Sequence, residues 1–314
     1  MSGLLLAGVL AVIAASGVRL AAADVLYETV VRTADSLTRG TAELEDTVTV
    51  SVKGDRIRQE IRGVRTVLTR HGARYQKLGH RVTLDQVDRG LRYEINLDAG
   101  TYIEEPFVGA RRQHEETIAA AEKVLGIAPT APAPTLAVSI ERPGEHQKVH
   151  GRDCERVILK TTKEVVLAAT RGTGRAGPEA VRFAMTDDLC IASDLPPMGE
   201  VRAIEERVED LTGMRGALAE RQLRVFEARR DILAVFELLQ RLMEREQHRL
   251  GGVPLKWERM FVGPRRDQPQ VTLFRHTGEV TRIETQPLDS IVFELPPGLT
   301  LDTRRLSADR SPTP

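Results

Sequence analysis

Three glycines, Gly172, Gly174 and Gly177, follow an apolar β-branched run and match the pattern G-x-G-x-x-G, with Asp194 downstream. In a dinucleotide-binding fold such glycines join a strand to a helix, the pyrophosphate meets the helix N-terminus, and a later acid binds the ribose. Alternating apolar residues at 181, 183 and 185 instead favour a strand after the glycines. No strand–helix–strand pattern surrounds the segment. We therefore interpret residues 171–177 as a hairpin loop and expect no nucleotide cofactor.

His146, His150 and Cys154 recur at spacings of four, which on a helix would place three metal-ligating side chains on one face. Pro143 and Gly151 argue against a helix there, and along a strand each spacing would span roughly 13 Å. The sequence also lacks H-E-x-x-H and G-x-S-x-G motifs. No pair of carboxylates stands out from the many charged residues. We predict no metal site and no catalytic residues, and hence a protein that is not an enzyme.

Cys154 and Cys190 are the only cysteines, and they are too far apart for a local C-x-x-C redox motif. In an oxidising compartment two such cysteines most often form a disulfide. The alternative is a pair of unbonded, buried thiols. The sequence therefore predicts a disulfide that closes the glycine-rich loop into a larger covalent loop.

Residues 1–23 carry the features of an export signal. An apolar run from Leu4 to Ala15 is followed by Arg19 and by the small residues that end at Ala23. Such a run followed by an A-x-A-like site predicts cleavage after Ala23. An uncleaved anchor is the alternative, although the run is shorter than the ~20 apolar residues that span a bilayer. We expect a periplasmic or secreted protein.

The amino-acid composition argues against nucleic acid as a binding partner. Lys plus Arg and Asp plus Glu each number 45, so no net charge attracts the chain to nucleic acid. Aromatic residues make up 4% of the chain, too few for platforms on which bases stack. Hydrophobic residues make up 41%, which suffices for a buried core.

The first third of the chain predicts antiparallel β-structure. T-V-T-V-S-V alternates with period two, and Lys53-Gly54-Asp55 is a turn signal that links it to a second alternating run. One apolar and one polar face per strand indicates a sheet with one solvated side. The expected strands are 25–31, 43–53, 56–61, 66–69, 73–77, 81–85, 91–97 and 101–104.

Helices and further strands follow. We expect a helix over 109–125 with Ile118, Ala121, Val124 and Leu125 on its buried face, and then an extended proline-rich linker at 128–134. A charged region at about 199–250 predicts two amphipathic helices, divided near Gly213. Residues 304–314 are expected to be a disordered tail. The other expected strands are 136–141, 156–162, 164–170, 180–186, 255–262, 270–276, 279–286 and 291–295.

Four short motifs, in order, carry a resemblance to a family. Residues 50–58, V-S-V-K-G-D-R-I-R, resemble the K-G-D-x-x-R hairpin of a family of uncharacterised exported bacterial domains. That family also has a run of the form D…Y-x-L…Y-x-E, which residues 88–104 resemble with Ile95 at the leucine position and one residue fewer. The later motifs G-x-x-C and F-x-x-P-x-G resemble residues 151–154 and 293–298. These domains are similar to the periplasmic lipoprotein carriers of the LolA/LolB type.

The resemblance implies an α+β fold: a strongly curved antiparallel sheet, or unclosed half-barrel, packed on helices. It covers residues 24–303 as a single domain, from which the helical insertion at about 199–250 and the glycine-rich loop depart. Carriers of this shape shelter acyl chains between sheet and helices, which implies a lipid, a lipoprotein or another apolar ligand as partner. The alternative is an envelope scaffold whose helices at 199–250 contact another envelope protein.

Overall fold

The computed structural model describes residues 24–35, 37, 42–68, 74–128, 136–167, 179–193, 195–229, 231–265 and 268–303. Several sequence predictions fall outside these residues: the signal segment 1–23 with its cleavage point after Ala23, the loop 171–177, Asp194, most of the linker 128–134, and the tail 304–314.

The described chain forms thirteen strands, four α-helices and one short 3-10 helix. The strands are β1 (Val25–Asp35), β2 (Ala42–Lys53), β3 (Arg56–Leu68), β4 (Arg74–Gln86), β5 (Leu91–Asn96), β6 (Thr101–Pro106), β7 (Val138–Glu141), β8 (His146–Val149), β9 (Arg152–Leu167), β10 (Glu179–Ala192), β11 (Val253–Arg265), β12 (Gln268–Thr285) and β13 (Thr300–Leu301). The helices are α1 (Phe107–Leu125), α2 (Pro196–Thr212), α3 (Ala217–Ala228), α4 (Ile232–Leu250) and the 3-10 helix η1 (Ser290–Phe293).

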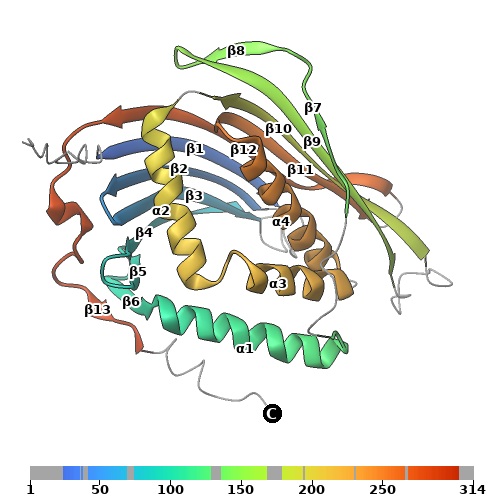
Figure 1. The fold of residues 1–314 in the computed structure, drawn as a ribbon, viewed down its shortest axis with the longest axis horizontal. Helices are drawn as coiled ribbons and strands as arrows, with labels where there is room; N and C mark the ends of the chain where they lie inside the picture. The colour runs from blue at the N-terminus through green and yellow to red at the C-terminus, as the bar shows by residue number, and fades with distance from the viewer. Residues whose placement is uncertain are drawn as a thin grey trace, which may run out of the picture.

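All thirteen strands belong to one sheet in the order β13-β6-β5-β4-β3-β2-β1-β12-β11-β10-β9-β7, with β8 paired to β9. Every pairing is antiparallel except that of β13 with β6. The sheet curves strongly around the helices (Figure 1). Strand β1 lies between β2 and β12 and so joins the N-terminal meander to the C-terminal strands.

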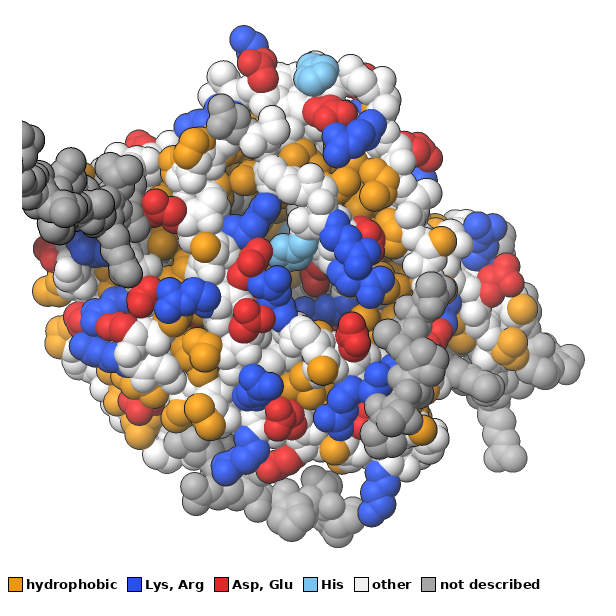
Figure 2. All heavy atoms as spheres, in the orientation of Figure 1, with side chains coloured by type: hydrophobic (Ala, Val, Ile, Leu, Met, Phe, Trp, Pro, Cys, Tyr) orange, Lys and Arg blue, Asp and Glu red, His pale blue; other side chains and the backbone are white. Residues whose placement is uncertain are grey.

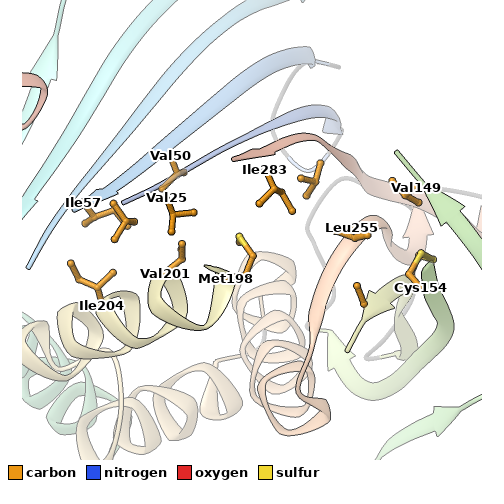
Figure 3. Close-up of a cluster of buried hydrophobic side chains, with 14 residues drawn as sticks. Val25, Val50, Ile57, Val149, Cys154, Met198, Val201, Ile204, Leu255 and Ile283 are labelled. Carbon is orange, nitrogen blue, oxygen red and sulfur yellow. A yellow bond between two sulfur atoms is a disulfide. The ribbon is translucent and has the colours of Figure 1, made fainter. Parts of the chain in front are cut away.

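The concave face of the sheet is covered by α2 and α4. Alternation along β1 and β2 turns Val25 and Val50 to this face, where they meet Val201 and Ile204 of α2 (Figure 3). Under α4, the rings of Phe183 and Phe261 stack with their centroids 5.5 Å apart, and the ring of Phe236 meets that of Phe261 edge-on. These contacts remove one face of the sheet from water, the main stabilising term in folding.

The predicted fold class is confirmed: helices pack on a curved, mostly antiparallel sheet. The predicted strand lengths were too short. Residues 156–162 and 164–170 were expected as two strands, but β9 runs through Lys163, which pairs with Phe183. Residues 270–276 and 279–286 likewise belong to the single strand β12, which passes through Gly278 opposite Trp257.

Three further expectations are corrected. The region 199–250 contains three helices, because a second break precedes Asp231, whose side chain caps α4 by accepting from the Ala234 N–H at 3.0 Å. Residues 290–293 form a 3-10 helix and not a strand, with Asp289 capping it. Val124 of α1 is 85% exposed. In its place, Glu122 turns inward to an ion pair with Arg221 at 2.7 Å.

Both predicted hairpins are present. Gly54 has a φ of +55° in the turn between β2 and β3, a conformation that glycine adopts without strain. Leu167 of β9 pairs with Glu179 of β10, so the glycine-rich segment joins two strands of one hairpin. A strand therefore follows the glycines where a dinucleotide fold requires a helix.

The β8–β9 arm, residues 146–156, extends over the side of the sheet opposite the helices (Figure 1). The predicted disulfide between Cys154 of this arm and Cys190 of β10 is confirmed, with Cα atoms 5.3 Å apart. Arg152 donates to the Ile283 carbonyl at 3.1 Å, and His150 pairs with Glu279 at 3.1 Å. The disulfide indicates that the chain folds in an oxidising environment.

We expect removal of this disulfide to lower the free energy of unfolding by roughly 2–4 kcal/mol, because the unfolded chain loses a constraint. Urea titrations of the oxidised protein and of a Cys154→Ser, Cys190→Ser variant would measure the difference. A reducing agent should shift the midpoint of the wild type and leave that of the double variant unchanged. Coincident curves for wild type and variant would contradict the prediction.

Candidate functional site

A pocket of about 370 Å³ lies between the concave face of the sheet and helices α2 and α4. We call it the inner pocket. Strands β1, β2, β3, β11 and β12 form its sheet wall, and side chains of α2 and α4 form its helix wall. In Figure 2, basic, acidic and histidine side chains gather at the centre of the viewed face, between the positions of α2 and α4 in Figure 1.

The sheet wall is mainly apolar. Period-two alternation places Tyr27 and Val31 of β1 on the same face, and Val48, Val253 and Val280 come from the neighbouring strands. Because these side chains share one side of the sheet, they form a mainly apolar surface, which Thr29 and Gln59 interrupt with polar groups. Such a wall suits the hydrocarbon part of a ligand.

Trp257, the only tryptophan of the chain, lies on the same wall because of a glycine. Trp257 of β11 pairs with Gly278 of β12. A Cβ atom at Gly278 would overlap the indole ring, so the missing side chain lets the ring lie against β12. The residue lines the inner pocket and also a larger hollow on the other side of the sheet.

Glu205 is the carboxyl group of the pocket whose pKa is raised most clearly. It follows Val201 by one turn of α2 and therefore lies at the edge of that helix's buried face. Desolvation by the surrounding protein, with a smaller effect of the charge of Glu209, raises the pKa of its carboxyl from 4.5 to about 7, although the residue is exposed and the charge of Arg202 acts in the opposite direction. Burial raises the pKa of Tyr27, and the negative charge of Glu205 raises it further. The two side chains therefore lie close together in the pocket.

Other charged groups of the pocket have partners. The Arg202 guanidinium donates to the Gly252 carbonyl. Glu244 accepts from the Gln240 amide at 2.9 Å and pairs with Arg259 at 3.5 Å. By contrast, no side chain or backbone group of the described residues donates a hydrogen bond to Glu205.

A buried ion pair joins strands β10 and β11 on the side of the sheet that α4 covers. Asp187, 1% exposed, accepts two hydrogen bonds of 2.8 Å from Arg259. Burial, and secondarily the charge of Arg259, lower the pKa of His276, whose ring contacts the Thr33 hydroxyl at 3.0 Å. This group joins β1, β10, β11 and β12, and through Glu244 it reaches α4. It thereby links α4 to the sheet beside the apolar contacts of that helix.

A second hollow, of about 800 Å³, lies under the β8–β9 arm on the opposite side of the sheet. His146 and His150 line it, whereas Cys154 is consumed by the disulfide. Its basic groups are neutralised locally, as in the pair of Arg156 with Asp188 at 2.7 Å. In the described residues no group of three His, Cys, Asp or Glu side chains is placed to hold a metal ion.

The residues of the inner pocket were missed by the sequence analysis. Tyr27, Glu205 and Trp257 come from β1, α2 and β11, and no local spacing relates them. The one feature of the sequence that could have indicated this site was Trp257, the single tryptophan, which lies in a strand of alternating residues.

No family model matches the chain, and no curated protein does. Among solved structures, the chain is similar to a beta-barrel-like protein of the domain of unknown function DUF1849 from Brucella abortus. The identity is 10%, the TM-score is 0.20, and the alignment covers 84% of this chain and 97% of the other. A likeness of this degree says nothing about a ligand. Across the described residues, no helix has the length and apolar character needed to cross a bilayer.

We expect Gly278→Ala to destabilise the protein by about 1–3 kcal/mol, since the new methyl group must displace the indole of Trp257. Tryptophan emission should change in the same variant, and thermal unfolding should show the loss. Gly79→Ala in β4 is the matched control, because nothing lies within 4 Å of its Cβ position. Equal effects of the two substitutions would argue against close Trp257–Gly278 packing.

We expect Glu205→Gln to raise the melting temperature above pH 7. A carboxyl whose pKa is raised from 4.5 to about 7 on folding destabilises the folded state progressively as the pH rises through that interval. The glutamine variant lacks this penalty, so it should match the wild type near pH 4 and exceed it at pH 8. Glu200→Gln, on the same helix but outside the pocket, is the control. A wild type more stable than the variant at pH 8 would contradict the sign.

Proposed function

We propose that the protein is a periplasmic or secreted binding protein that shelters the apolar part of a ligand in the inner pocket and catalyses no reaction. The ligand class is a lipid, the acyl part of a lipoprotein, or another apolar molecule. The observation that carries this proposal is an apolar sheet wall facing two helices across about 370 Å³, within the ~300–1,000 Å³ typical of ligand sites.

Two further observations support this reading. The disulfide suits an oxidising compartment outside the cytoplasm, as do the export features of residues 1–23. The curved sheet covered by helices has the architecture that the resemblance to carriers of the LolA/LolB type implies.

The alternative of an envelope scaffold has less support. A docking surface on helices 199–250 requires a contiguous apolar stripe on their outer side. Among the large hydrophobic side chains exposed in the described chain, Leu211 and Leu233 belong to this segment, and they lie on different helices. The apolar faces of α2 and α4 are turned to the sheet.

Native mass spectrometry of the protein, purified gently from its own cells, tests the proposal. We expect a bound mass that extraction identifies as a lipid or another apolar molecule. Val48→Phe should abolish this mass, because the ring occupies the pocket. Thr49→Phe, the next residue of β2, should retain it because the ring points to the other side of the sheet.

Two outcomes would overturn the proposal. One is a wild type without ligand that co-purifies with another protein, which would favour the scaffold. The other is a bound mass that persists equally in Val48→Phe, which would place the ligand elsewhere.

A further inference from the structure

The inner pocket combines two aromatic rings with a carboxylate. Tyr27 and Trp257 lie on its sheet wall, and Glu205 faces them from α2. The faces of aromatic rings are electron-rich and attract cations, tryptophan most strongly. A carboxylate beside such rings adds a negative charge when it is ionised. This combination differs from a purely apolar acyl-chain site.

Arg202 partly offsets the charge of Glu205: its guanidinium donates to the Gly252 carbonyl, and its positive charge also attracts the Glu205 carboxylate. Glu244 is engaged by Gln240 and Arg259. Glu205 accepts no hydrogen bond from the described residues, so its oxygens can receive a donor from a ligand. An anionic ligand group would meet this carboxylate unfavourably, whereas a cationic group would complement it.

This inference rests on the proposed function of the inner pocket. We propose that its ligand carries an ammonium group, either an amine or a quaternary ammonium, which lies between the carboxylate of Glu205 and the rings of Tyr27 and Trp257. The apolar body of the ligand then extends along the valines of the sheet wall. The ligand class is therefore a cationic or zwitterionic amphiphile.

Affinity for a permanently charged ammonium should depend on pH. Because the pKa of Glu205 is about 7 in the free protein, affinity should be full above pH 7 and fall as the pH drops below it. The variant Glu205→Gln should lose this pH dependence. The ionisable and charged groups that face Glu205 are Tyr27 from β1, Arg202 and Glu209 from α2, and Glu244 and His248 from α4.

The experiment compares three probes that share a dodecyl chain and differ in the head group: dodecyltrimethylammonium, dodecyl maltoside and dodecyl sulfate. Each is titrated below its micelle concentration while the emission of Trp257, the sole tryptophan, is followed. Isothermal calorimetry repeats the titrations without relying on Trp257. We expect the ammonium probe to bind about tenfold more tightly than the neutral one, and the sulfate most weakly.

Variants test whether the preference for the ammonium head group comes from Glu205 and Trp257. Glu205→Gln should lower the affinity for the ammonium probe about tenfold and leave that for the maltoside unchanged, which also shows that the variant is folded. Glu200→Gln should leave both unchanged. In Trp257→Phe, measured by calorimetry, the affinity for the ammonium probe should fall several-fold more than the affinity for the maltoside.

Failure of the ammonium inference and failure of the proposed function would give different results. Equal binding of the three probes, or a preference for sulfate, would overturn the ammonium inference while leaving an apolar binding function in place. An ammonium preference that survives Glu205→Gln would also overturn it. Binding of none of the probes would overturn the proposed function, and the inference with it.

Discussion

The structure depends on one constraint: the concave face of the sheet is apolar, and something other than the sheet must cover it. Among the described residues, the two margins of the sheet, β13 on one side and β7 and β8 on the other, are not paired with each other. Helices α2 and α4 therefore supply the cover. Straight helices laid on a strongly twisted surface cannot touch it everywhere. The inner pocket lies where this contact is incomplete, and the polar edges of both helices line it.

The buried pair of Asp187 and Arg259 shows how polar groups set that arrangement. Removing two charges from water is costly, and here two short hydrogen bonds and the contact with Glu244 offset the loss. Hydrophobic contacts alone would let α4 slide along the sheet, because they have little directionality. Arg259 bonds to Asp187 on the sheet and pairs with Glu244 of α4 at 3.5 Å, and so adds a directional contact between this helix and the sheet.

The sequence predicts the sheet better than it predicts the site. Period-two alternation identifies most strands, because one side of each faces the core. Strand ends were misplaced where a polar or glycine residue has a reason to be inside a strand: Gly278 reads as a turn but makes room for Trp257. The inward position of Glu122 could not be predicted, because its partner Arg221 lies on another helix. The pocket could not be predicted, since the pairing of distant strands decides which residues meet.

Strand β1 pairs on one side with β2, its neighbour in the chain, and on the other with β12, in which Val25 meets Thr285. Because a chain is synthesised from its N-terminus, β1 can pair with β2 early, but its other edge stays unpaired until β12 has been synthesised. Closing so long a loop carries a large entropic cost before any contact forms, which slows folding. During this interval the open edge of β1 can pair with other chains. Completion of the sheet is thus a late event, and the newly made chain needs protection until its last strands arrive.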